Sequence, residues 1–258
     1  HFKAESLPIV PTLFISIACG AISGFHATQS PLMTRCMNNE REARPIFFGA
    51  MISESVVALI WAAIAMAFFG GVEQLNDFMA ANNSNAGVAV SLISDTTLGT
   101  IGGILAILGV VVAPITSGDT AFRSARLIIA DMLHYDQKPK YKRLIVSMPL
   151  FAIGIGIAFV DFDIIWRYFA WSNQALSVLT LWMITAWLMR RGSRASLLAL
   201  IPAMIMTYIC ASFVFVSDQF VGMGACDLAY IYGGAVTAVV SGLLILKIGK
   251  DVKRGAEI

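Results

Sequence analysis

Charged side chains are scarce in this chain: they make up 13% of its 258 residues, whereas hydrophobic residues make up 58%. The mean hydropathy of +0.77 is far above that of an ordinary soluble domain. This composition excludes a water-soluble globular protein. It predicts an all-α integral membrane protein, because a helix pairs its own backbone polar groups inside a bilayer.

Motifs for catalysis and metal binding are also missing. The four cysteines, Cys19, Cys36, Cys210 and Cys226, have no CxxC spacing, which argues against a disulfide framework and against a zinc site. The chain has no Walker loop, GxGxxG turn, HExxH pair or GxSxG elbow, and no pair of catalytic carboxylates. We therefore expect no enzyme activity, no cofactor and no metal.

Seven apolar runs are long enough to cross a bilayer, which takes about 20 residues. They cover about 8–25, 46–71, 98–116, 143–161, 167–189, 196–217 and 226–247. The polar connection between the second and third runs contains a possible short helix at 87–94. The chain begins with His1 and shows no signal peptide, so we expect a fragment that lacks an N-terminal portion.

Basic residues gather in alternate connections between these runs. The basic clusters are Arg35, Arg41 and Arg44; Lys138, Lys140, Lys142 and Arg143; Arg190, Arg191 and Arg194; and Lys247, Lys250, Lys253 and Arg254. The other connections are mainly acidic. By the positive-inside rule, the C-terminus is cytoplasmic and the N-terminal edge lies outside. Topology accounts for the clusters; the alternative is a patch that binds nucleic acid or anionic lipid, and we expect no nucleic-acid partner.

The first apolar run is interrupted by Cys19-Gly-Ala-Ile-Ser-Gly-Phe-His-Ala-Thr-Gln-Ser-Pro31. Gly20 and Gly24 lie four residues apart, on one face of a helix, with Ser23 beside them. One interpretation is close helix packing through small residues. The other is an unwound segment whose backbone groups hold an anionic or zwitterionic solute.

The residues from His26 to Ser30 are mostly polar and precede Pro31. This pattern predicts an extended or turned Ser30 and a new helix starting near Pro31. His26 is a candidate proton carrier, because histidine titrates near neutral pH; the alternative is an inert histidine at the membrane interface. We include Gln29 with His26 among the candidate solute ligands.

Two further polar groups are candidates for ion coupling. Glu54 lies in the second apolar run, where a carboxylate costs about 2.5–3.5 kcal/mol unless it is paired, protonated or hydrated; the alternative is a structural hydrogen bond. Thr116, Ser117 and Asp119 offer the hard oxygen ligands that small cations prefer. Alternatively, Ser117 or Asp119 caps an amphipathic cytoplasmic helix with an Asp119–Arg123 pair, or the same helix simply continues.

Asn173 and Gln174 are adjacent carboxamides in the fifth run. They follow the aromatic residues Trp166 and Tyr168, which we expect at the outer membrane interface. Asn173 and Gln174 form hydrogen bonds between helices in one interpretation and contact the solute in the other.

Three segments of the chain resemble the carbon starvation protein A family: 18–31, 120–131 and 166–174. The likeness runs from about residue 8 to residue 250. Members are bacterial inner-membrane carriers linked to uptake of peptides and, in some cases, to proton-coupled uptake of pyruvate. They are considerably longer on the N-terminal side, which agrees with a fragment.

The family is grouped with the amino acid-polyamine-organocation carriers, whose leucine-transporter-like core has two inverted five-helix repeats. The resemblance implies that residues 1–189 are the second repeat, with a broken first helix. Residues 190–258 would add two C-terminal transmembrane helices and a short cytoplasmic tail. In sodium-coupled relatives, the span that corresponds to Thr116 and Ser117 contributes hydroxyl ligands to an ion site.

We therefore expect a secondary active transporter of the bacterial inner membrane that imports a peptide or pyruvate by ion-coupled symport during carbon starvation. The expected partners are the lipid bilayer, the solute, a proton or sodium ion, and the missing N-terminal repeat. The alternative is a membrane nutrient sensor that signals through a partner. The candidate solute-binding residues are Gly20, Ser23, Gly24, His26, Gln29, Asn173 and Gln174, and the candidate ion-coupling residues are His26, Glu54, Thr116, Ser117 and Asp119.

Overall fold

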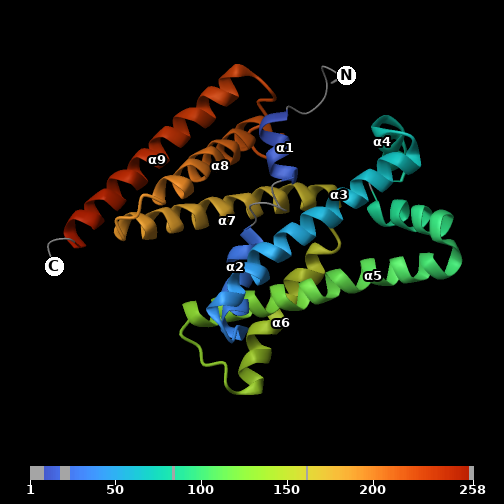
Figure 1. The fold of residues 1–258 in the computed structure, drawn as a ribbon, viewed down its shortest axis with the longest axis horizontal. Helices are drawn as coiled ribbons and strands as arrows, with labels where there is room; N and C mark the ends of the chain where they lie inside the picture. The colour runs from blue at the N-terminus through green and yellow to red at the C-terminus, as the bar shows by residue number, and fades with distance from the viewer. Residues whose placement is uncertain (1–8, 18–23, 83–84, 161, 256–258) are drawn as a thin grey trace. The chain divides into compact units, whose positions relative to one another are not determined.

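A computed structural model describes residues 9–17, 24–82, 85–160 and 162–255, and this part of the chain is helical, without β-strands (Figure 1). Four helical stretches in it are long and apolar enough to cross a membrane: Glu40–Phe69, Ala86–Met132, Ser196–Val216 and Asp227–Asp251. The predicted fold class, an all-α integral membrane protein, is confirmed. The number of seven spans and the inverted-repeat architecture stay predictions.

The chain forms two compact units. One unit holds the chain up to Ser30 and from Val160 onward, and the other holds Pro31–Phe159. The predicted domain boundary at residue 189 is based on the inverted-repeat architecture and not on how the helices pack, and it stays a prediction. The two units are described separately below.

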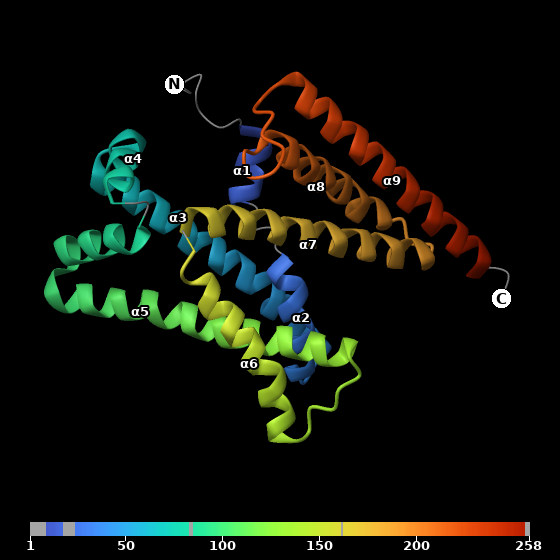
Figure 2. The same ribbon diagram turned by 180° about the vertical axis from the view of Figure 1, so that it is seen from behind.

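The first unit contains α1 (Ile9–Ile17), the start of α2 (Gly24–Cys36), α7 (Phe162–Arg190), α8 (Ser196–Val216) and α9 (Asp227–Gly255). Both ribbon views show α7, α8 and α9 side by side, with α1 at one end of α8 (Figures 1 and 2). The largest group of buried apolar side chains joins α1 to α8 and consists of Ile15, Met206, Ile209, Cys210 and Phe213.

Hydrogen bonds from aromatic side chains connect the helices of this unit. The indole Nε1–H of Trp182 in α7 donates to the hydroxyl of Thr207 in α8 over 3.0 Å. The hydroxyl of Tyr230 in α9 donates to the carbonyl oxygen of Val10 in α1 over 2.7 Å. A buried Trp side chain usually finds such a partner, as Trp182 does here, whereas the bond of the half-buried Tyr230 is exposed; both bonds join neighbouring helices.

The second unit contains the short helices η2 (Glu40–Glu42) and η3 (Arg44–Gly49), followed by α3 (Ala50–Phe69), α4 (Val72–Ala81), α5 (Ala86–Met132) and α6 (Lys140–Ile157). Helix α4 folds back on α3, where the ring centroids of Phe69 and Phe78 lie 4.6 Å apart. Helix α5 bends sharply at Gly99, whose φ of 67° and ψ of −176° suit glycine alone. The short helix predicted at 87–94 is confirmed as the part of α5 before this bend.

Two local predictions are wrong. Helix α2 does not restart near Pro31 but continues through it to Cys36. Likewise, no helix begins at Ser117 or Asp119, because α5 continues to Met132; continuation of the same helix is therefore the correct alternative. In both cases a continuous helix keeps nearly all backbone N–H and C=O groups hydrogen-bonded. A proline within the helix removes only one N–H donor.

Candidate solute and ion sites

Helix α2 begins in direct contact with α7. A Cβ atom built on Gly24 would lie 2.3 Å from the carbonyl oxygen of Asn173 and 2.6 Å from Cβ of Leu176, so only glycine permits this approach. The structure thus brings together two predicted site residues, Gly24 and Asn173, that are far apart in the sequence. Gly20 and Ser23 lie outside the described residues.

Asn173 and Gln174 are buried in the first unit, with exposed fractions of 7% and 0%. The Ser177 hydroxyl donates to the Gln174 backbone carbonyl over 2.7 Å and approaches Oε1 of the Gln174 side chain at 3.3 Å. The burial of both carboxamides, with Ser177 beside Gln174, agrees with the interpretation that they form hydrogen bonds within the helix bundle. A solute contact of either carboxamide stays a prediction.

His26 and Gln29 are half-buried on α2. Their spacing of three residues places them on one face of the helix. Because successive residues are rotated by about 100°, this face lies on the side of α2 away from the Gly24 contact with α7. The structure therefore does not gather His26 and Gln29 against Asn173.

Glu54 lies on α3 with an exposed side chain. It stands near the middle of the 30-residue helical stretch Glu40–Phe69, whose most apolar window contains no buried residue. The flanking hydroxyls of Ser53 and Ser55 donate to the carbonyls of Gly49 and Met51 in their own helix, over 3.0 Å and 2.9 Å. They are thus engaged within α3, and the ion-coupling role of Glu54 stays a prediction.

Thr116, Ser117 and Asp119 lie within one turn of α5, and all three are exposed. The carbonyl of Thr116 accepts the hydroxyl of Thr120 over 2.6 Å. The predicted pair of Asp119 with Arg123 is confirmed, with 3.0 Å between Oδ2 and Nη2. Within the described ranges, no three His, Cys, Asp or Glu side chains are grouped as they would be around a metal ion.

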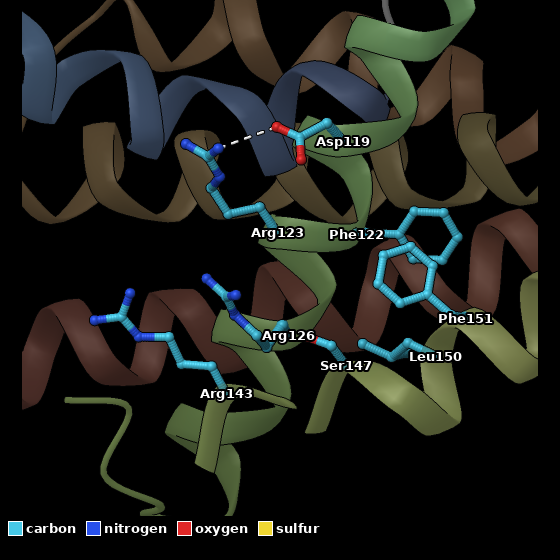
Figure 3. Close-up of a pocket in the computed structure, with 8 residues that line it drawn as sticks. All are labelled: Asp119, Phe122, Arg123, Arg126, Arg143, Ser147, Leu150 and Phe151. Carbon is cyan, nitrogen blue, oxygen red and sulfur yellow. Dashed lines mark hydrogen bonds and ion pairs between the residues drawn. The ribbon is translucent and has the colours of Figure 1, made fainter. Parts of the chain in front are cut away.

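A basic pocket between α5 and α6 is the feature that sequence reasoning missed. It has a volume of about 440 Å³, and Arg123 and Arg126 of α5 and Arg143 of α6 line it, together with Asp119 (Figure 3). The i,i+3 spacing of the two arginines on α5 was a usable signal. Membrane topology explains the basic cluster that contains Arg143, and nothing in the spacing shows that Arg143 lies across the same cavity from Arg126.

The helices of the described chain, with apolar residues over most of their exposed surface, define a multi-pass α-helical membrane protein. Comparison with known proteins gives the family. A model of the carbon starvation protein CstA family matches residues 2–100. An uncharacterized protein of Haemophilus influenzae is 49% identical over 114 residues, which cover 44% of this chain and 82% of that protein. This chain therefore belongs to the carbon starvation protein CstA family.

Two further relatives have names that describe transport. The pyruvate/proton symporter BtsT of Escherichia coli is 40% identical over 85 residues, which cover 33% of this chain and 11% of the symporter. The peptide transporter CstA of Helicobacter pylori is 26% identical over 268 aligned positions, which cover 78% of this chain and 38% of the transporter. The chain thus spans well under half of either named transporter. No solved structure matches it.

Proposed function

We propose that this chain is part of a secondary active transporter of the bacterial inner membrane that imports a peptide or pyruvate. The observation that carries the proposal is the similarity to a peptide transporter over 78% of the chain, joined by the similarity to a pyruvate/proton symporter. The charge pattern supports a cytoplasmic C-terminus. The remainder of the solute site would lie on the first repeat of the full-length carrier.

The solute site would lie around the start of α2. The contact of Gly24 with Asn173 supports this location, because it sets a helix N-terminus against a helix with two buried carboxamides. In general, the first backbone N–H groups of a helix and the helix dipole favour a carboxylate, which both a peptide and pyruvate carry. In this proposal Gly20, Ser23 and Gly24 contribute backbone groups, whereas Asn173 and Gln174 line the path.

Glu54 and His26 would carry the coupling proton. Glu54 lies in an apolar helix, where a charged carboxyl would cost up to about 2.5–3.5 kcal/mol at the bilayer centre, so binding a proton there stabilises the helix in the membrane. A group that gains and loses a proton during the cycle can couple solute movement to a proton gradient. Thr116, Ser117 and Asp119 would form the ion site if sodium were the coupling ion.

The test is uptake of labelled pyruvate and of a labelled dipeptide by the full-length protein in proteoliposomes with an imposed proton or sodium gradient. We expect proton-driven accumulation that falls to passive equilibration in Glu54→Gln, because glutamine cannot release a proton. His26→Ala should also weaken the response to the proton gradient. Glu73→Gln, in the first turn of α4, is the matched control and should retain accumulation.

The outcomes separate the parts of the proposal. Proton-driven accumulation that survives in Glu54→Gln would remove this residue from the coupling mechanism and leave transport standing. Sodium-driven accumulation would shift the coupling site to the α5 residues. If neither solute moves under either gradient, transport itself is refuted, and the alternative of a nutrient sensor becomes the better hypothesis.

A further inference from the structure

The basic pocket between α5 and α6 has an excess of positive charge among the described residues that line it. Three arginines against one aspartate leave two positive charges in excess. Asp119 is paired with Arg123, so its carboxylate is already engaged. Arginine guanidinium groups, with five N–H donors in a planar fork, match the oxygens of phosphates and carboxylates.

Arg126 is the arginine with the clearest need for a ligand. Its Nε atom is buried and has no hydrogen-bond partner among the residues that the structure describes. A buried donor without an acceptor costs about 1–3 kcal/mol, and more when it belongs to a charged group. An anion in the pocket would provide the missing acceptor.

Arg143 is held beside Arg126 by the connection that precedes α6. Its Nε donates to the carbonyl of Gln137 over 2.6 Å, and its Nη2 approaches the carbonyl of Lys138 at 3.4 Å. These bonds fix the side chain while leaving further guanidinium N–H groups available. The pocket is therefore arranged before a ligand binds, which lowers the entropic cost of binding.

The opposite side of the pocket is apolar. The rings of Phe122 and Phe151 stack with centroids 4.6 Å apart, and Figure 3 shows them on the side opposite to the three guanidinium groups. At 1.5 Å per residue, Phe151 lies about 12 Å further along α6 than Arg143, away from the connection between the helices. On α6 the charged Arg143 thus lies near the start of the helix and Phe151 toward its middle, whereas on α5 Phe122 lies between Asp119 and Arg123.

We propose that this pocket binds the phosphate group of an anionic ligand, with Arg126 and Arg143 as its main contacts. A pocket with guanidinium groups on one side and aromatic rings on the other suits the headgroup and first acyl carbons of an anionic phospholipid, and basic pockets between transmembrane helices at the cytoplasmic side bind such headgroups. A free phosphate ion or a phosphorylated solute offers the same anionic group. The cytoplasmic placement rests on the orientation proposed above, whereas the anion site itself rests on the pocket.

The experiment measures lipid and phosphate binding to the purified full-length protein. In one arm, phosphatidylglycerol is titrated into phosphatidylcholine vesicles that contain the protein, and retained lipid is counted by native mass spectrometry. In the other arm, inorganic phosphate is added in pure phosphatidylcholine, and thermal unfolding is followed. The variants are Arg126→Gln and Arg143→Gln, and Lys142→Gln removes the same charge beside the pocket, where Lys142 lies over the ring of Tyr135.

We expect a preference for phosphatidylglycerol that falls about tenfold for each arginine replaced and is unchanged in Lys142→Gln. Protection by inorganic phosphate with the same variant pattern would identify a free anion as the source and would equally support the site. The proposal is overturned if the unmodified protein distinguishes neither lipid and gains nothing from phosphate, a result that does not depend on the folding of any variant. It is also overturned if Lys142→Gln loses as much binding as Arg126→Gln.

Discussion

Replacing Gly24 by alanine should force α2 away from α7. The added Cβ would lie 2.3 Å from the carbonyl oxygen of Asn173, where ordinary contacts begin at 3.4 Å, so the helices must separate by about 1 Å. The nearest atom belongs to the backbone of α7, and therefore no side-chain rotation relieves the clash. Overpacking of this kind costs about 1–3 kcal/mol.

The assay is thermal unfolding of the full-length protein, together with solute uptake. A cost of about 1–3 kcal/mol corresponds to a fall in Tm of roughly 2–12 °C for a domain of this size. We expect uptake to fall as well, because the separation displaces Asn173 from the start of α2.

Gly242→Ala is the matched control, because a Cβ at Gly242 in α9 would meet no atom of the described residues within 4 Å. Alanine there should leave Tm unchanged or raise it slightly, since alanine favours a helix more than glycine does. Equal Tm values for Gly24→Ala, Gly242→Ala and the unmodified protein would refute the contact between α2 and α7, and with it the assembly of the proposed solute site.

Two more substitutions test the framework of each unit by thermal unfolding. Thr207→Val should destabilise the protein by about 1–3 kcal/mol, because it leaves the buried Nε1–H of Trp182 without an acceptor. The control Thr180→Val removes an exposed hydroxyl that is bonded within its own helix, so it should have little effect. Equal effects of the two substitutions would argue against the bond between α7 and α8. Gly99→Ala should cost about 1–3 kcal/mol through backbone strain at φ 67°. Gly109→Ala in the same helix, where a Cβ would meet none of the described residues within 4 Å, should be neutral or stabilising. An equally harmless Gly99→Ala would show that α5 does not bend there.

Local sequence rules predicted structure correctly where a single signal acted and failed where two signals competed. The Asp119–Arg123 pair follows from helical spacing and is present at 3.0 Å. Pro31 was interpreted as a helix start, yet α2 runs through it. Proline weakens a helix by removing one donor, but ending the helix would unpair several backbone groups, and the larger cost determines the outcome.

Composition and hydropathy were sufficient to predict an all-α membrane protein, because any chain this apolar must pair its backbone groups inside its own helices. The three segments 18–31, 120–131 and 166–174 were sufficient to indicate the family. The contact of Gly24 with Asn173 and the placement of Arg126 beside Arg143 came from the folded structure alone. Lipid tails are as apolar as the helix surfaces, so the hydrophobic pattern that drives a helix into the membrane does not specify which helices pack together; close contacts between particular small and polar residues do.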